Sequence, residues 1–297
     1  MNISHLKTYL MVASTKSFTR AAQELFTTQP TVTNHIQSLE EELGYQLFVR
    51  SGASVRLTAE GERLAQKVNE IFRLIDEVKG AALSRENGVS GTLNIAASSV
   101  MGAYYLPSVL KVVLEQYPNI DIQLHFGTAH SIAAWVQSAF VDLGFAPRSP
   151  GFAKLKFKPL LVDPCVIAAG SSRYAAYSEE LKNGNCANQH FILREKGTKN
   201  HAIAMKWLKK QPWYPGMRAP TILANMESIK NLVLEGAGVT IIPRSCVKQE
   251  FERGLMKEIK TSMPLEDINY FMIERKSDKN SEIAGIFKRL LEAEAGR

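Results

Sequence analysis

The spacing of apolar residues predicts three consecutive helices at the start of the chain. The first spans about residues 3–15, where apolar side chains recur at helical spacing at Leu6, Tyr9, Leu10 and Ala13. Ser17 is a suitable N-cap for a short second helix that turns Ala21, Ala22 and Leu25 inward. The third begins at Thr28, carries Pro30 in its first turn and ends at Gly44. Two short helices joined by a tight turn predict a helix-turn-helix.

The third helix has two different faces. Its apolar face steps by four, three and four through Val32, Ile36, Leu39 and Leu43. The opposite face carries Pro30, Thr33, Asn34, Gln37 and Ser38, followed by Glu41. Small polar side chains of this kind read base edges in the major groove, and a helix N-terminus attracts phosphate. The alternative is an ordinary surface helix with a solvated polar face.

A short β-hairpin is predicted directly after these helices. Residues 47–50 and 55–57 form its strands, and the small residues 51–54 form its tip. Arg50 and Arg56 flank this turn, where they can contact the phosphate backbone or enter a minor groove. A helix-turn-helix followed by such a hairpin is a winged helix.

A long helix is predicted over about residues 59–85, with Thr58 as its cap. Its apolar positions repeat at 4-3-4-3-4 spacing, which is the seam of a coiled coil: Leu64, Val68, Ile71, Ile75, Val78 and Ala82. Phe72 and Leu74 widen this stripe slightly, so a helix buried within its own chain is the alternative. The seam predicts self-association, with a dimer as the minimum and a dimer-or-tetramer choice left open.

The rest of the chain alternates between apolar strands and helices. A joint at Asn87, Gly88, Ser90 and Gly91 precedes predicted strands over 93–97, 120–126 and 142–146, with helices up to 117 and over 132–139. This alternation predicts a parallel sheet with crossover helices. A second run of the same kind starts at 160–169 and ends at 239–243. The segments 268–275 and 281–293 return to the first lobe.

This pattern predicts an α/β multidomain protein. A winged helix-turn-helix domain would occupy residues 1–58 and a linker helix with its hinge residues 59–90. Residues 91–297 would form two α/β lobes with a cleft between them. Lobe I would contain about 91–162 and 267–297, and lobe II about 163–266.

Four predicted loops at strand ends contain residues suited to a small anion. Ligands of open α/β sheets bind at the carboxyl ends of strands, where helix N-termini point. The residues of these loops singled out for binding are Ser98, Ser99, Val100, Thr128, Thr198 and Asn225. Hydroxyls, backbone N–H groups and the nearby Lys196 and Lys199 suit an oxyanion or carboxylate. Ordinary helix capping is the alternative for each loop.

The motifs resemble one known family. The run FTRAAQELFTTQPTVTNHIQSLEEELGYQLFVR, followed by RLTAEGERL, is similar to the N-terminal signature of LysR-type transcriptional regulators. The resemblance implies a winged-helix DNA-binding domain, a dimerising linker helix and a C-terminal sensor with a periplasmic-binding-protein fold. Its helix-turn-helix would run from Phe18 to Gln37.

The resemblance also assigns roles to individual residues. The DNA-reading positions fall on Gln29, Pro30, Thr31, Thr33, Asn34 and Gln37. Many relatives carry Ser and Arg where this chain has Thr33 and Asn34, so the resemblance implies DNA binding but not the same base preference. The family's effector loops align with Ser98, Ser99, Thr128 and Thr198. The stretch ASSVMGAYYLP is similar to relatives that control sulfur-oxyanion metabolism, so sulfite and sulfate are leads for the effector.

Composition narrows the class of protein. The 297 residues are 45% hydrophobic and 22% charged, as in a globular protein, and no apolar run is long enough to span a membrane. A poor signal peptide and three scattered cysteines favour the cytoplasm. The net charge of +7 lies wholly beyond residue 90, because the first 90 residues hold ten basic and ten acidic side chains. DNA binding is therefore inferred from motif geometry.

No sequence motif indicates catalysis or a cofactor. Nucleophile elbows, zinc-protease motifs, phosphate-binding loops and complete dinucleotide fingerprints are missing, and His125 with His130 implies no third metal ligand. The chain is thus predicted to be a ligand-responsive transcription factor, activator or repressor, and not an enzyme. Its expected partners are double-stranded DNA, a small anion and another copy of itself, with RNA polymerase as a further candidate. An unregulated architectural DNA-binding protein, or a small-molecule binding protein or enzyme, is the alternative.

Overall fold

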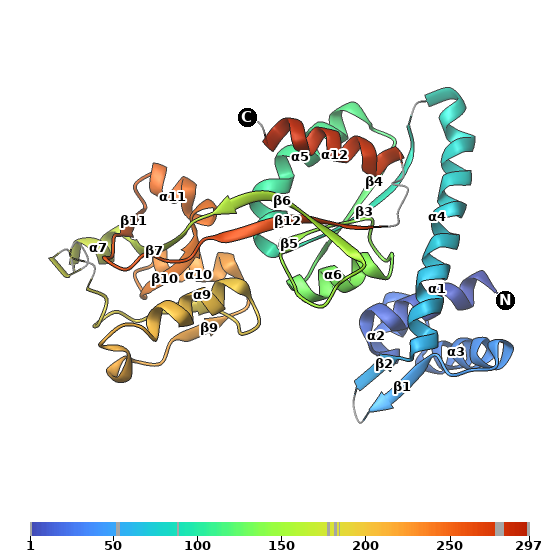
Figure 1. Ribbon diagram of the computed structural model, residues 1–297, viewed down its shortest axis with the longest axis horizontal. Coiled ribbons are helices and arrows are strands. Elements are labelled where there is room, and N and C mark those ends of the chain that lie inside the picture. The colour runs from blue at the N-terminus through green and yellow to red at the C-terminus, as the bar shows by residue number, and fades with distance from the viewer. Residues whose placement is uncertain are drawn as a thin grey trace.

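The structure is a computed structural model that describes residues 2–51, 54–87, 89–176, 179–180, 183, 185–276 and 282–295. Figure 1 shows its three parts, which follow one another along the chain. A small helical domain with a hairpin is joined by the long helix α4 (Ala59–Asn87) to a two-lobed α/β part. The hairpin tip at Gly52–Ala53 and the predicted hinge residue Gly88 lie outside the described residues.

The N-terminal domain contains the predicted helices and hairpin. Its elements are α1 (Ile3–Thr15), α2 (Phe18–Glu24), α3 (Gln29–Leu43), β1 (Phe48–Ser51) and β2 (Ser54–Leu57). Ser17 caps α2 and Thr28 caps α3, because each hydroxyl accepts a backbone N–H from the first turn. Gly44 ends α3 with φ +77°, a left-handed conformation that favours glycine.

The first turns of α4 belong to the core of this domain. The Tyr9 hydroxyl donates to the Gly61 carbonyl, and a Cβ on Gly61 would lie only 2.3 Å from the Leu47 carbonyl oxygen. Val68 is 1% exposed within the same cluster, and Leu64 packs against it. These two members of the predicted coiled-coil seam are therefore covered by their own chain.

The remaining seam residues differ in their surroundings. Ile71 is 36% exposed, Ile75 is half-buried, and the neighbouring Leu74 is exposed. The side chains of Val78 and Ala82 lie outside the described residues. The first residues of the 4-3-4 repeat therefore pack in the core of the winged domain. The later residues Ile71 and Ile75 are more exposed to solvent.

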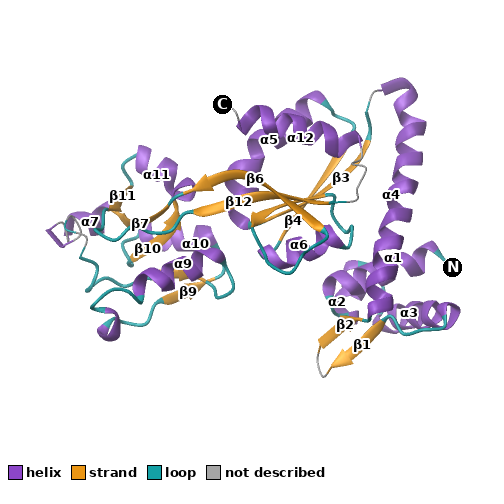
Figure 2. Ribbon diagram, in the orientation of Figure 1, coloured by secondary structure: helices purple, strands orange, loops and turns teal. Residues whose placement is uncertain are grey.

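Lobe I is a five-stranded sheet covered on both faces. Its strand order is β4-β3-β5-β12-β6, with bounds Ile120–Phe126, Gly91–Ala97, Leu143–Pro147, Ile268–Arg275 and Leu155–Asp163. Figure 2 shows α5 (Leu106–Gln116) and α12 (Glu282–Ala295) on one face and α6 (Ala129–Gln137) on the other. A π-helical turn, Met101–Tyr105, leads into α5.

The prediction of a parallel sheet is only partly correct. Strands β3, β4 and β5 are parallel, but β12 runs antiparallel to both β5 and β6. The reason is the chain path: β6 leaves lobe I for lobe II, and β12 comes back beside it in the opposite direction.

Lobe II contains two small sheets joined by a single bridge. Strands β10 (Val239–Pro243), β7 (Cys165–Gly170) and β11 (Met256–Ile259) pair antiparallel, whereas β8 (Ile192–Arg194) and β9 (Thr221–Leu223) pair parallel. The Phe191–Val239 bridge connects them. The described helices of this lobe are α7 (Ser171–Ala176), α9 (Lys199–Leu208), α10 (Met226–Leu234) and α11 (Lys248–Glu252), with short 3-10 turns at Tyr214–Gly216 and Arg244–Val247.

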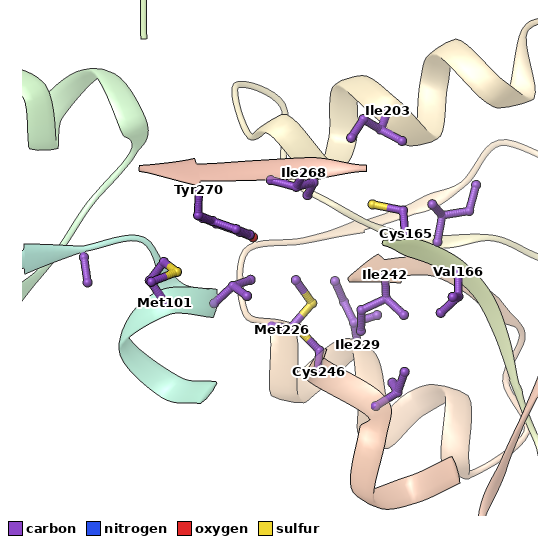
Figure 3. Packing of buried hydrophobic residues seen from close by; sticks show 14 of the residues in the cluster. Met101, Cys165, Val166, Ile203, Met226, Ile229, Ile242, Cys246, Ile268 and Tyr270 are labelled. Atoms are coloured by element: carbon purple, nitrogen blue, oxygen red, sulfur yellow. The ribbon is translucent and has the colours of Figure 1, made fainter. Parts of the chain in front are cut away.

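One hydrophobic cluster continues through both lobes. In Figure 3, Tyr270 and Ile268 of β12 lie above Met101 of lobe I and above Met226 and Cys246 of lobe II, and all five residues belong to this cluster. Nearby, the buried Asp163 carboxylate accepts hydrogen bonds from the backbone N–H and the hydroxyl of Ser245. The crossing between the lobes is therefore packed and hydrogen-bonded.

A side-chain hydrogen bond also connects α4 with lobe I. The Asn69 amide nitrogen lies 2.7 Å from the carbonyl oxygen of Ser138, the residue that caps the C-terminus of α6. The last carbonyls of a helix have no intrahelical partner, so this bond satisfies one of them.

The close approach at Gly61 leads to a stability prediction. Gly61→Ala forces a methyl group against a backbone carbonyl that is held by the hairpin, and we expect the winged domain to lose about 3 kcal/mol of unfolding free energy. All three tryptophans (Trp135, Trp207 and Trp213) lie beyond residue 90. On heating, circular dichroism should therefore detect a transition of the winged domain at a lower temperature, and tryptophan fluorescence should not change in that transition.

Gly285→Ala is the matched control. Gly285 lies within α12, and its nearest neighbour to an added Cβ is the flexible Arg289 side chain at 3.9 Å. This variant should be neutral or slightly more stable, because alanine favours a helix. Equal unfolding curves for Gly61→Ala and the parent protein would contradict the proposed docking of α4.

Candidate functional site

The polar face of α3 is open to solvent. Gln29, Pro30, Asn34, Gln37 and Ser38 are exposed, and Thr31 and Thr33 are half-buried. The opposite face, with Val32, Ile36 and Leu39, is buried in the domain core. Gln29 donates to the Thr33 hydroxyl at 3.1 Å, which arranges these two side chains before any ligand arrives. The face predicted to read DNA is therefore accessible.

The wing and the turn supply further exposed groups. Arg56 is exposed on β2, whereas the side chain of Arg50 lies outside the described residues. Phe26, between α2 and α3, is 97% exposed and has φ +50°, a conformation that is rare for a bulky residue. Its exposure could not be predicted from the sequence, because an apolar residue in a turn carries no periodic signal.

A stacked histidine pair lies behind the exposed face. The rings of His5 on α1 and His35 on α3 are 4.4 Å apart, and His35 Nδ1 lies 2.9 Å from the Thr8 hydroxyl oxygen. That hydroxyl also donates to the Ser4 carbonyl, so His35 Nδ1 carries the proton and donates to Thr8. Burial, followed by the charge of His5, lowers the pKa of His35 below its usual value.

The two lobes enclose a cavity of about 520 Å³. Its walls include every residue that was predicted from the sequence to bind an effector: Ser98, Ser99, Val100, Thr128, Thr198 and Asn225. They come from both lobes, at the carboxyl ends of β3 and β4 in lobe I and before α9 and α10 in lobe II. Segments far apart in the sequence thus face one another.

Three of these residues are helix caps. The Thr128 hydroxyl accepts from Ser131 N at 3.2 Å, and the Thr198 hydroxyl from His201 N at 3.2 Å. Asn225 Oδ1 accepts from the backbone N–H groups of Glu227 and Ser228. The capping interpretation is therefore correct for all three. The positive ends of α6, α9 and α10 also converge on the cavity, which favours a negative charge inside it.

A buried arginine in the cavity wall was missed at the level of the sequence. Arg194, whose side chain is 9% exposed, donates to the Ala224 carbonyl and pairs with Glu195 at 3.0 Å. A strand-end arginine has no signal in the sequence that distinguishes it from a surface arginine. Its guanidinium adds fixed positive charge to lobe II.

An ionic cluster joins the lobes at one side of the cavity. Tyr104 of lobe I donates to the Glu227 carboxylate of lobe II, and Lys230 Nζ lies 3.2 Å from Glu227 and 2.9 Å from Glu250. Burial alone would lower the pKa of Lys230, but the hydrogen bonds to these carboxylates outweigh it and raise that pKa. Burial, together with the bond to Glu227, raises the pKa of Tyr104.

The cysteine thiols are poorly suited to redox sensing. Cys165, Cys186 and Cys246 are all buried. Burial raises the pKa of the Cys165 and Cys186 thiols to about 12, and it raises the pKa of Cys246 as well. Reactive cysteines need an accessible thiolate, so these side chains behave as core residues.

The residues that the structure describes contain no group of three or more His, Cys, Asp and Glu side chains placed to hold a metal ion. His125 packs against Phe140, with ring centroids 5.1 Å apart, and burial lowers its pKa. His130 lies against Phe152. Among the described helices, none is long and apolar enough to cross a membrane.

Two family descriptions match the chain. "Bacterial regulatory helix-turn-helix protein, lysR family" covers residues 3–62, and "LysR substrate binding domain" covers residues 86–296. The chain belongs to the LysR family of transcriptional regulators. It is a DNA-binding regulator with an effector-binding domain, which confirms the resemblance drawn from the sequence.

Individual relatives span nearly the whole chain. The regulator CysL of Bacillus subtilis is 27% identical over 276 residues, covering 91% of this chain and 88% of CysL. The structure of a full-length OxyR variant from Pseudomonas aeruginosa aligns with a TM-score of 0.65 at 19% identity, over 98% of this chain and 95% of that one. CbnR in complex with its target DNA aligns with a TM-score of 0.61 at 20% identity, over 99% of both chains. The structural matches support the same fold.

The His35 environment leads to a pH prediction. A histidine with a lowered pKa in the folded state binds fewer protons than it does in the unfolded chain. Stability of the winged domain should therefore fall as the pH drops below the ordinary value of 6.5 toward the lower folded pKa. Circular dichroism melts at about pH 7.5 and about pH 5.5 would measure this loss.

His35→Asn keeps a donor for Thr8 and removes the titrating ring, so it should reduce the pH dependence. The same substitution at His130, in lobe I, should leave the winged domain's pH dependence unchanged. A winged domain that melts at the same temperature at both pH values would show that the His35 environment has no energetic effect.

Proposed function

We propose that the winged domain reads DNA through the exposed face of α3 and that a small anion in the cavity between the lobes controls this binding. The observation that supports it most directly is the cavity itself, into which two lobes turn helix N-termini, hydroxyls and Arg194. Base contacts are assigned to Thr33, Asn34 and Gln37, with Gln29, Pro30, Thr31 and Ser38 beside them. Arg50 and Arg56 hold the phosphate backbone.

The proposed division of the chain follows its elements. Residues 1–58 bind DNA, residues 59–90 link and dimerise, and residues 91–297 bind the effector. Lobe I takes about 91–162 and 267–297, and lobe II about 163–266. Because Val68 is used within the winged domain, the partner's helix is assigned to the later positions Ile71, Leu74 and Ile75, with Val78 and Ala82 beyond them. A dimer engages two half-sites together.

The proposed effector is anionic because positive charge dominates the free groups in the cavity wall. Three helix N-termini point into it, and Lys199 lines it. Glu195 and Glu227 also line it, but Arg194 pairs with the first, and Tyr104 and Lys230 pair with the second. Sulfite, sulfate and thiosulfate belong among the compounds to test, on the likeness of residues 97–107 to regulators of sulfur-oxyanion metabolism.

The remaining assignments follow from the role of a regulator. We propose that the protein acts in the cytoplasm, catalyses no reaction and needs no cofactor, and that RNA polymerase is a partner. An effector shifts DNA binding only by its difference in affinity for two arrangements of the protein. An unregulated architectural protein would show DNA binding that no small molecule alters.

Replacing Asn34 and Gln37 together by alanine tests the DNA-reading face. Each lost base contact is worth about 1–3 kcal/mol, so we expect affinity for a DNA site selected from a random duplex library to fall by at least about 30-fold. Nonspecific binding should change little. Fluorescence anisotropy at fixed salt measures both affinities.

Gln123→Ala with Asn188→Ala is the matched control, since it removes the same two amide types from exposed positions in the lobes. It should bind the selected site as the parent protein does. If the Asn34 and Gln37 variant kept full specificity, α3 would not be the reading helix.

A thermal-shift screen of the full chain tests the cavity. The panel contains sulfite, sulfate, thiosulfate, phosphate and simple carboxylates. A ligand at about 100 times its Kd should add about 2.7 kcal/mol and raise the midpoint of the effector domain by several degrees. Ser99→Ala and Thr128→Ala should each abolish a selective shift, because both residues line the cavity.

Ser108→Ala, on the surface of α5, is the control and should keep the shift. A shift that survives in both cavity variants would place the anion elsewhere. DNA binding is measured separately, so the two halves of the proposal stand or fall independently.

A further inference from the structure

An exposed aromatic residue forms part of the cavity wall in lobe I. Phe126, the last residue of β4, lines the cavity and is 57% exposed. In the sheet it pairs with Ala97 of β3, so it lies at the same strand ends as Ser98 and Thr128. A phenyl ring is therefore open to solvent beside the residues that we propose hold an anion.

The surrounding backbone holds this ring in place. A Cβ on Gly102, in the π-helical turn before α5, would lie 2.4 Å from Phe126 Cε1, so the ring packs directly against the glycine. The next residue in the chain is Gly127, where a Cβ would lie 2.7 Å from the Trp135 ring. Strand β4 thus passes into α6 through a closely packed turn, and the position of Phe126 at the cavity wall follows from that turn.

Other apolar groups line the same cavity. Ala103 of lobe I and Ala224 of lobe II are exposed in its wall, and Met226 contributes a buried side chain. The wall therefore combines two kinds of surface. Hydroxyls and helix N-termini suit an acidic group, and the aromatic and aliphatic side chains suit a hydrocarbon group.

An inorganic oxyanion would use only the polar part of this wall. Sulfate has no apolar surface, so its binding would leave Phe126 in contact with water. A hydrocarbon group that packs on the ring removes apolar surface from water, which tightens binding about fourfold for each buried methylene group. The cavity volume of about 520 Å³ is also in the range of sites that hold small organic molecules.

We propose that the effector is an organic acid with an apolar body of several carbon atoms, and that Phe126 determines this specificity. The acid group lies against Ser99, Thr128 and the N-terminus of α6, and the apolar body packs on the Phe126 ring. This inference rests on the proposed function of the cavity and adds the class of ligand.

A series of acids that differ in apolar surface tests the inference. The full chain is titrated calorimetrically with acetate, butanoate, hexanoate and phenylacetate, and with sulfate as the anion without an apolar body. We expect hexanoate or phenylacetate to bind about tenfold or more tightly than acetate, because only the larger acids cover the ring.

Two cavity variants separate the two parts of the wall. Phe126→Ala should bring the affinity ratio between the larger acids and acetate to about one, with little change for acetate itself. Thr128→Ala should weaken every acid and leave this ratio unchanged. Leu114→Ala is the matched control: it removes an apolar side chain that is equally exposed, at 57%, from α5 outside the cavity wall, and it should alter neither affinity nor ratio.

The outcomes for this inference differ from those for the proposed function. Equal affinity across the series, no binding by any organic acid, or a ratio that Phe126→Ala leaves unchanged would overturn the inference. If sulfate then bound in a manner sensitive to Ser99→Ala and Thr128→Ala, the cavity would remain the effector site with an inorganic ligand. The comparison of acids on the parent protein decides the ligand class even if Phe126→Ala fails to fold.

Discussion

The docking of the first turns of α4 against the winged domain is the contact on which the arrangement of the molecule depends. Gly61 allows the helix to approach the Leu47 carbonyl, Tyr9 donates to the Gly61 carbonyl, and Val68 closes the core. Because these contacts are buried, the direction of α4 is fixed relative to α3. The part of the protein that follows α4 is thereby oriented relative to the face of α3 that we propose reads DNA.

Local signals in the sequence predict the elements of the winged domain well. The Ser17 and Thr28 caps, Pro30 and Gly44 mark helix ends through bonds within one turn, and such bonds do not depend on the rest of the fold. The 4-3-4 repeat of α4 is different. Periodicity shows that Leu64 and Val68 must be covered, but it does not say whether their own domain or a second chain covers them.

The pairing of β12 could not be predicted for a related reason. Its apolar pattern indicates a strand over residues 268–275. The direction in which this strand pairs depends on the path of the chain through lobe II, between β6 and β12. The two strands form an antiparallel ribbon that both lobes share. Sliding one strand past the other by one residue would turn every side chain of that strand to the opposite face, so the buried face fixes the register of the ribbon.

The candidate cavity was predictable where it uses strand ends and helix starts. Ser98, Thr128, Thr198 and Asn225 follow a rule about open α/β sheets, and all four line the cavity. Tyr104 and Glu227 obey no such rule, because they meet from positions 123 residues apart in the chain.

Helix α6 connects the cavity wall with α4. Its first residues follow Thr128 in the cavity wall, and the residue at its C-terminus, Ser138, accepts the hydrogen bond from Asn69 of α4. A nine-residue helix is about 13 Å long. The contacts that connect the cavity wall with α4 therefore lie along one short helix of lobe I, and none of them involves lobe II.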